Sequence, residues 1–282
     1  FYHPSRLGAV FTKGITHQPR VGNPPPRLHE TPAGILNSIG LENPGVVRFI
    51  KEHLPRLRGL GTVIIPNISG STVKEYCKVA AYLDGKEGVS ALEVNISCPN
   101  VSEGGMAFGS SPEMAANVVK EIHKVTDLPL IVKLSPNVTD IVLIARAVEE
   151  AGASGLSLIN TLLGMAIDID GQKPVLGNVV GGLSGPAVKP IGLRMVYQVS
   201  QAVKIPVVGM GGIASWQDAV EFLLAGAVAV CIGTVNFINP MAAVDVLEGI
   251  KGYCNAKGVT KVMALSGKSW RKKDVDCKQR IN

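Results

Sequence analysis

Long apolar runs are absent from this sequence. No stretch reaches the roughly eighteen apolar residues that a membrane-spanning helix requires. The first residues, Phe1-Tyr2-His3-Pro4, also lack the basic start, apolar core and cleavage site of a secretory signal. We therefore expect a soluble, cytoplasmic protein with no membrane contact. The 282 residues, 46% of them hydrophobic and only 18% charged, can bury one large core, so a single domain is expected.

Cysteine is scarce, and its spacing shows no pairs. The five cysteines are an odd number, form no C-x-x-C pair and have no histidine at metal-ligand spacing. This pattern argues against a zinc site and indicates a reducing compartment. The cysteines are Cys77, Cys98, Cys231, Cys254 and Cys277.

Aromatic residues make up only 5% of the chain, and basic residues gather at one end. The net charge is +6, but the segment after Gly267 alone contributes +4, from six basic residues against Asp274 and Asp276. The rest is close to neutral and has no basic stripe interleaved with aromatics, which argues against nucleic-acid binding. We expect residues 267–282 to form a solvated basic tail after a domain of residues 1–266.

Seven short apolar runs, most of them rich in valine and isoleucine, alternate with stretches of helical character. Apolar strands of this kind are typical of a parallel sheet covered by helices. The runs are Leu7 to Lys13, Thr62 to Ile68, Ala91 to Ser97, Leu128 to Leu134, Gly155 to Asn160, Ile205 to Met210 and Ala227 to Ile232.

Start and stop signals for helices lie between these runs. Ser111-Pro112 places a cap and a first-turn proline before a helix over Met114 to Val125. Ser215, with an aspartate three residues later, opens a helix that Gly226 closes, and Asn239-Pro240 starts the last one. The chain is therefore expected to alternate strands and helices.

The positions of unusual residues distinguish a closed barrel from an open sheet. An open sheet concentrates them at one switch point, whereas here they follow nearly every run, as in a (β/α)8 TIM barrel. We predict that α/β fold. Because such a barrel has eight strands, we expect the first strand to be missing from this chain and to lie upstream of Phe1. The segment Ile15 to Asn43, rich in proline and glycine, is expected to cross the barrel mouth.

Glycine-rich turns follow the last two runs, at Gly209 to Ala214 and at Gly233-Thr234. In barrels these two loops commonly bind phosphate, because backbone N–H groups and a helix dipole converge on the anion. The first turn also fits the dinucleotide pattern G-x-G-x-x-A, but no acidic residue ends the next run to hold a ribose. A phosphate cradle is the favoured interpretation, and plain tight turns are the alternative.

Lysines and asparagines recur near the C-terminal ends of the runs. Lys13 and Lys133 follow apolar residues, where a charge is costly unless an anion or a structural ion pair meets it. A ring of carboxamides suits a planar heterocycle with alternating N–H and C=O groups, such as a pyrimidine. Taken singly, each asparagine is more typical of a turn or cap. The asparagines are Asn37, Asn67, Asn95, Asn100 and Asn160.

The segment Val94 to Asn100 is the densest group of chemically active residues. It places Cys98 at the end of an apolar run, with a glycine-bearing loop, Gly104 to Gly109, behind it. A thiol here can act as a nucleophile or a general base, and the loop can act as a lid. Because no histidine or carboxylate in the motif would activate a nucleophile, proton transfer within a redox reaction is at least as plausible. The other four cysteines are expected to be inert.

Several motifs together resemble the class 1 dihydroorotate dehydrogenases, over about Leu7 to Gly258. The Asn-Pro-Pro-Pro-Arg string and the continuation Val101 to Gly105 resemble the NAD-linked branch rather than the fumarate-using one. The motifs that carry the resemblance are Thr12-Lys13-Gly14, Gly22 to Arg27, Leu36 to Leu41, Asn95 to Asn100 and Ile159-Asn160-Thr161.

The resemblance implies a bound FMN and a dihydroorotate or orotate substrate. By this resemblance, Cys98 removes a proton from C5 of dihydroorotate while a hydride leaves C6 for N5 of the flavin, and lysine charge stabilises the reduced flavin. The FMN-binding residues would be Lys13, Gly14, Asn67, Asn95, Lys133, Ile159, Gly185, Gly211, Gly212, Gly233 and Thr234. The substrate-binding residues would be Lys13, Asn37, Ser38, Ile39, Gly40, Leu41, Asn95, Asn100, Asn160 and Thr161.

The NAD-linked branch also implies partner subunits. In that branch a homodimer of catalytic subunits forms the core of a heterotetramer, whose other subunits carry FAD and a [2Fe-2S] cluster. These pass electrons to NAD during de novo pyrimidine (UMP) biosynthesis. No cysteine cluster in this sequence would hold the iron-sulfur centre. Because the family's first strand contributes a loop to FMN binding, weak or no FMN binding is expected of a chain that lacks it.

Two other interpretations stay open. The Asn-x-Ser-Cys-Pro element also resembles the flavin domain of dihydropyrimidine dehydrogenase, a pyrimidine reductase that acts on uracil. Lys13 and the run Asn37 to Leu41 favour a substrate with a carboxylate instead. The remaining alternative is a truncated, non-catalytic barrel that only contacts the partner subunit, and loss of FMN with retained partner binding would indicate it.

Overall fold

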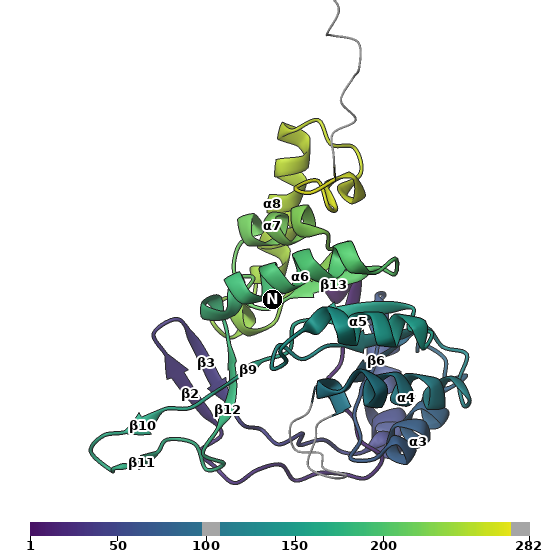
Figure 1. The fold of residues 1–282 in the computed structure, drawn as a ribbon, viewed down its shortest axis with the longest axis vertical. Coiled ribbons are helices and arrows are strands. Elements are labelled where there is room, and N and C mark those ends of the chain that lie inside the picture. Colours follow the sequence, from purple (N-terminus) through teal and green to yellow (C-terminus); the bar gives the residue numbers. More distant parts are fainter. Residues whose placement is uncertain (98–107, 272–282) are drawn as a thin grey trace, which may run out of the picture.

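A row of parallel strands forms the centre of the computed structural model, which describes residues 1–97 and 108–271 (Figure 1). Six strands pair in the order β14-β13-β8-β7-β6-β5, and β1 pairs with β4. A parallel bridge between Ile15 and Ile68 joins the two groups. All seven predicted runs contain strands: β1 Ala9–Phe11, β4 Val63–Ile65, β5 Asn67–Ile68, β6 Leu92–Asn95, β7 Leu130–Lys133, β8 Gly155–Leu158, β13 Val207–Met210 and β14 Ala229–Cys231.

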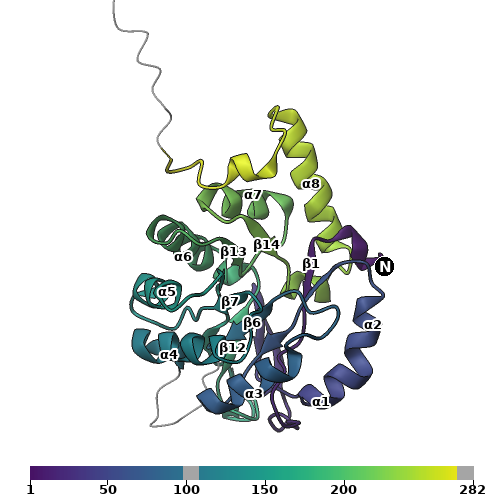
Figure 2. The ribbon, with the colours of Figure 1, turned by 90° about the vertical axis from the view of Figure 1, so that its right-hand side faces the viewer.

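Helices surround these strands (Figure 2). The predicted caps of α4 and α7 are confirmed, because Ser111 and Ser215 each accept a hydrogen bond from the first turn of their helix. The last helix begins at Ala242, two residues later than the predicted start at Asn239-Pro240, and Asn239 Oδ1 accepts the N–H of Met241 instead. The helices are α1 Val46–Arg48, the π-helix η2 Phe49–His53, α2 Leu54–Arg58, α3 Val73–Leu83, α4 Pro112–His123, α5 Ile141–Glu150, α6 Lys189–Ala202, α7 Trp216–Ala225 and α8 Ala242–Ala256.

The order of the strands around the row follows their order in the chain, as in a (β/α)8 barrel. The strands β1 and β14 are the two ends of the row, and they do not pair with each other within residues 1–97 and 108–271. The predicted barrel order is therefore confirmed for the seven runs. The further strand expected between these two ends stays a prediction.

A small antiparallel sheet, in the order β2-β3-β12-β9, lies at the carboxyl ends of the parallel strands. Its first hairpin belongs to the predicted excursion Ile15 to Asn43, which indeed leaves the central row. Its other half belongs to a second excursion between β8 and α6 that the sequence did not indicate. The elements are β2 Leu28–Thr31, β3 Gly34–Asn37, β9 Leu162–Gly164, β12 Gly181–Ser184 and the short hairpin β10 Ile167–Asp168 with β11 Lys173–Pro174.

The core lies between the parallel strands and the helices. Helix α5 shows how the sequence directs this packing, because its buried residues recur at helical spacing. They are Ile141, Ile144, Ala145 and Val148. In the described residues, no helix combines the length and apolarity needed to cross a membrane.

The start of the predicted basic tail contacts the barrel. Gly267 and Ser269 donate main-chain hydrogen bonds to the carbonyls of Leu223 and Leu224, and Trp270 Nε1 donates to Ala225 O at 2.9 Å. These carbonyls end helix α7, so residues 267–271 satisfy acceptors that a helix leaves open at its C-terminus. Residues 272–282 lie outside the described part.

Candidate active site

A cavity of about 480 Å³ opens at the carboxyl ends of the parallel strands. The loops after β8, β13 and β14 form part of its wall, and the tip of the β2–β3 hairpin forms another part. Of the predicted flavin-binding residues, the cavity is lined by Lys133, Ile159, Gly185, Gly211, Gly212, Gly233 and Thr234. Of the predicted substrate-binding residues, Asn160 and Thr161 line it.

The two glycine turns meet in this cavity and present unused backbone donors. The N–H groups of Gly211, Gly212, Gly233 and Thr234 donate no hydrogen bond within the described residues. Gly212 has a φ of 79°, and a Cβ there would lie 2.6 Å from the backbone nitrogen of Lys189. Only glycine therefore fits this turn without displacing the start of α6. Four free N–H groups in adjoining turns could hold a phosphate.

Asp218 holds the first glycine turn in place. One of its carboxylate oxygens accepts hydrogen bonds from the N–H groups of Ala214 and Ser215, and the other lies 2.6 Å from Lys189 Nζ. Burial opposes the ionisation of Asp218, but the Lys189 ammonium and the backbone donors outweigh it and lower the pKa of this carboxyl. The pair thus ties the start of α7 to the start of α6.

Inside the barrel, Lys133 lies on the floor of the site beside a carboxylate. Its Nζ is 3.8 Å from Glu93 Oε2, so the structural ion pair considered for this lysine exists. Glu93 also accepts hydrogen bonds from Asn67 Nδ2 and from Ser157 Oγ. Glu93 and Ser157 escaped the sequence analysis because a carboxylate and a hydroxyl inside apolar strands give no motif.

Asn67 has a carboxamide oxygen without a partner. Its Oδ1 is buried and accepts no hydrogen bond within the described residues. Beside it, Gly14 leaves room that a side chain would fill, because a Cβ would lie 3.1 Å from this oxygen and 3.2 Å from Leu41 Cδ2. Three of the predicted ligand-binding residues therefore meet around one unsatisfied acceptor, which calls for a donor from a ligand.

Asn95 and Asn160, two of the predicted amides, lie next to each other. Asn160 Nδ2 is 3.4 Å from Asn95 Oδ1, which also accepts the N–H of Ser97 at 3.1 Å. The hydroxyl of the buried Tyr76 donates to the main-chain carbonyl of Asn95 at 2.7 Å. The end of β6 is thereby joined to α3 and to the residues that follow β8.

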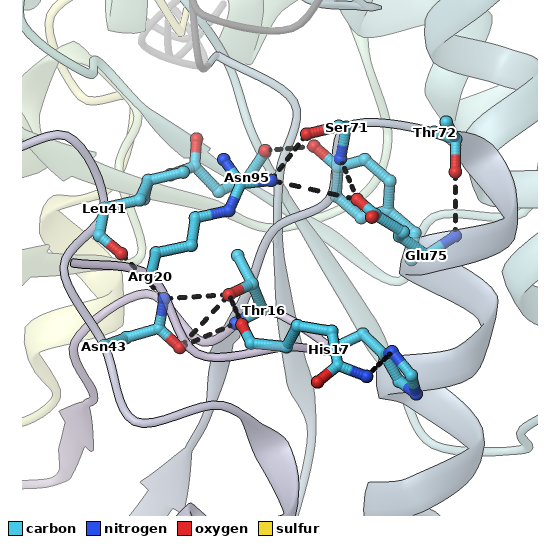
Figure 3. Close-up of polar contacts among 11 residues, drawn as sticks. Thr16, His17, Arg20, Leu41, Asn43, Ser71, Thr72, Glu75 and Asn95 are labelled. Atoms are coloured by element: carbon cyan, nitrogen blue, oxygen red, sulfur yellow. Dashed lines mark hydrogen bonds and ion pairs between the residues drawn. The ribbon is translucent and has the colours of Figure 1, made fainter. Parts of the chain in front are cut away.

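The run Asn37 to Leu41 is anchored on both sides. Asn23, from the Asn-Pro-Pro-Pro-Arg string, donates through Nδ2 to Ser38 Oγ at 2.9 Å and through its N–H to Ile39 O at 3.1 Å. On the other side, Asn43 Nδ2 donates to Leu41 O at 2.7 Å (Figure 3). The run also contacts the second excursion, because Asn37 Nδ2 donates to Gly182 O at 3.1 Å.

A polar cluster ties the first excursion, Ile15 to Asn43, to the barrel wall. Asn43 and Thr16 are buried and hydrogen-bond to each other, and Arg20 reaches across to Ser71 Oγ at 2.5 Å (Figure 3). Glu75, in the first turn of α3, accepts the N–H of Ser71. The run Asn37 to Leu41 is therefore placed by tertiary contacts and not by its own local structure.

Some predicted residues are not placed in the cavity. Cys98 and Asn100 lie outside the described residues. Lys13 follows β1, next to Thr12, whose hydroxyl accepts the N–H of Asn67 at 3.2 Å. The other predicted residues in the described part of the chain do not line the cavity: Lys13, Gly14, Asn67, Asn95 and the run Asn37 to Leu41.

The cavity also contains residues that were not predicted. Ser184 Oγ accepts a hydrogen bond from the Thr234 hydroxyl at 2.9 Å, and the hairpin tip contributes residues 30–35. Cys231 lines the cavity as well, and burial raises the pKa of its thiol to about 11 although the charge of Lys133 opposes this. A thiol with that pKa stays protonated at neutral pH, so it is a poor nucleophile. Within residues 1–97 and 108–271, no three His, Cys, Asp or Glu side chains cluster as metal ligands.

The fold and site together define a class of protein. Parallel strands in barrel order, with glycine turns that offer free N–H groups on the loops of the last two strands, are typical of barrel enzymes that act with a phosphorylated cofactor or substrate. The sequence profile described as "Dihydroorotate dehydrogenase" matches residues 1–253. The chain belongs to the dihydroorotate dehydrogenase family.

Curated relatives refine this assignment. A protein of Desulforamulus reducens is 58% identical over 93% of this chain and 86% of its own length. One of Alkaliphilus metalliredigens is 56% identical over 93% of this chain and 87% of its own, and one of Geobacillus sp. is 52% identical over 96% and 87%. All three are named "Dihydroorotate dehydrogenase B (NAD(+)), catalytic subunit". The resemblance to the NAD-linked branch is thereby confirmed.

Proposed function

We propose that this chain is the catalytic subunit of a NAD-linked dihydroorotate dehydrogenase and oxidises (S)-dihydroorotate to orotate in pyrimidine biosynthesis. The observation that carries the proposal is the meeting of the two glycine turns, Lys133 and the amide of Asn160 in one cavity, in a chain 58% identical to a protein of that name. The enzyme is then a flavin oxidoreductase that acts on a CH–CH group.

FMN fits the residues present. The free N–H groups of the two glycine turns suit its phosphate, and the orphaned Asn67 Oδ1 suits a ring N–H. Lys133 brings positive charge to the cavity, which favours an anionic reduced ring. When bound, FMN supplies the hydride acceptor. The proposed holders are the eleven FMN-binding residues named from the resemblance.

The carboxamides provide the recognition of substrate in this proposal. Asn95 and Asn160 lie side by side, and Asn37 is joined to the same wall through Gly182. Such amides pair with the alternating N–H and C=O edge of a pyrimidine. Lys13 supplies the positive charge for the substrate carboxylate, and Cys98 takes the proton from C5.

Electrons leave through other subunits in this proposal. The partner carries FAD and a [2Fe-2S] cluster, and a homodimer of this chain forms the core of the assembly. The word "subunit" in the names of the relatives supports a partner. The side chains of Leu163, Met165, Ile167 and Ile169 are exposed along the second excursion, and such apolar groups are typical of a surface that pairs.

The test is anaerobic mixing of the FMN-loaded protein with dihydroorotate, with the visible absorbance of oxidised flavin as the readout. Bleaching by dihydroorotate supports the proposal. Persistent colour with dihydroorotate, together with reactivity toward uracil or dihydrouracil, would favour the pyrimidine reductase. Failure to hold FMN, with partner binding retained in a pull-down, would favour the non-catalytic barrel.

A further inference from the structure

Glu93 is a buried carboxylate that the proposed function leaves without a role. It lies in β6, is only 1% exposed, and contacts side chains from β5, β7 and β8. A side chain on β6 reaches three other strands only from inside the barrel. Burying a carboxylate is costly unless partners compensate, so each partner of Glu93 is informative.

The first partner, Asn67, is oriented by Glu93. Asn67 is 5% exposed, and its Nδ2 donates to Glu93 Oε2. An ionised carboxylate only accepts hydrogen bonds, so the NH2 end of the amide must face Glu93 and the oxygen must face away. That oxygen is the buried acceptor without a partner, next to Gly14. Glu93 thus decides which end of the amide is offered to a ligand.

Ser157 and Lys133, the second and third partners, fix the position of Glu93 and balance its negative charge. Ser157 Oγ donates to Glu93 Oε1 at 2.6 Å, which fixes the carboxylate between β5 and β8. Lys133 Nζ lies 3.8 Å from Oε2 and also lines the cavity. One negative charge beside this lysine reduces the positive potential that a ligand in the cavity experiences.

We propose that Glu93 is a positioning residue for the flavin. It turns the Asn67 carboxamide so that Oδ1 accepts an N–H of the flavin ring, and it moderates the charge of Lys133 and so the reduction potential of bound FMN. The proposal rests on the FMN assignment made above, but not on the identity of the substrate.

Two substitutions separate the two effects. Glu93→Gln keeps the shape, and its single oxygen can still accept from Asn67 while its NH2 meets Ser157 Oγ, so mainly the charge is lost. We expect its FMN dissociation constant to stay within about threefold and its midpoint potential to become more positive. Glu93→Met also removes the acceptor, so Asn67 loses its anchor, and we expect FMN to bind about tenfold more weakly, or ~1.4 kcal/mol.

A matched control is Glu149→Gln. Glu149, in α5, is also a structural carboxylate, since its Oε1 accepts the N–H of Lys204, just before β13, at 2.6 Å, and it does not line the cavity. It should leave both the FMN dissociation constant and the potential unchanged.

The measurements are FMN titration by fluorescence quenching and dye-coupled potentiometry, both without substrate. Wild-type binding and potential in both Glu93 variants would overturn the role of Glu93. If circular dichroism shows that Glu93→Met does not fold, the potential of Glu93→Gln decides alone. Wild-type protein that binds no FMN would instead refute the cofactor assignment, so the two failures are distinguishable.

Discussion

The backbone conformation of Gly212 shapes a turn that is proposed to bind FMN. Its φ of 79° is costly for other residues, and a Cβ would press on the backbone of Lys189. We expect Gly212→Ala to displace the turn and to weaken FMN binding about tenfold or more, or ~1.4 kcal/mol. Fluorescence titration with FMN measures this. The control is Gly252→Ala in the exposed part of α8, where nothing lies within 4 Å. It should leave FMN binding intact and raise the free energy of unfolding by about 1 kcal/mol.

The proposed role of Cys98 as a base can be tested directly. As the proposed base it acts on the substrate and not on the cofactor, so Cys98→Ala should retain bound FMN. We expect the rate of flavin bleaching by dihydroorotate to fall by about 10²-fold or more, the usual contribution of a positioned base. Stopped-flow absorbance under anaerobic conditions measures it, and Cys254→Ala, in a buried position of α8, is the matched control. An unchanged rate would assign the proton transfer to another group.

At the scale of elements, the joint between α6 and α7 depends on Asp218. Its carboxylate binds Lys189 and caps α7, so Asp218→Asn should lower the free energy of unfolding by about 1–2 kcal/mol at pH 7. Because the folded-state pKa is lowered, this stabilisation is present above the unfolded pKa of about 3.9. It is lost as pH falls through the lowered folded value.

The difference between the wild type and Asp218→Asn should therefore be constant near neutrality and shrink below about pH 4. Urea denaturation at a series of pH values measures it. A difference that stays constant down to pH 2 would show that the ionised carboxylate does not stabilise the joint.

At the scale of the whole molecule, the folded domain extends further into the C-terminal segment than the basic charge of that segment suggests. Residues Gly267, Ser269 and Trp270 satisfy the last carbonyls of α7. Deleting 267–282 should leave the carbonyls of Leu224 and Ala225 without these donors and cost about 1–3 kcal/mol of stability. Deleting only 272–282 keeps these donors in place and should therefore cost less stability than the longer deletion. Thermal unfolding of the two truncated chains measures the difference, and equal melting temperatures would place the domain boundary at residue 266.

Local signals in the sequence were sufficient to predict the barrel order of the strands. Valine-rich and isoleucine-rich runs report burial on both faces, and Ser111 and Ser215 mark helix starts through contacts with their own first turns. The pair Gly211-Gly212 was also readable, because both residues have positive φ, a backbone conformation that favours glycine. By contrast, the antiparallel sheet over the mouth joins residues such as Asn37 and Gly182, 145 positions apart, and no local pattern predicts that pairing.

The sequence by itself therefore determined the alternation of strands and helices, the turns that suit a phosphate and the family to which the chain belongs. Only the tertiary structure decided which polar groups meet inside the barrel. Glu93, Asn67, Ser157 and Lys133 come from four strands, and their contacts depend on the register of those strands and on the side of each strand that faces inward. Hydrogen bonds across strands act over a few ångströms in space but over tens of residues in sequence, so they become visible only once the chain has folded.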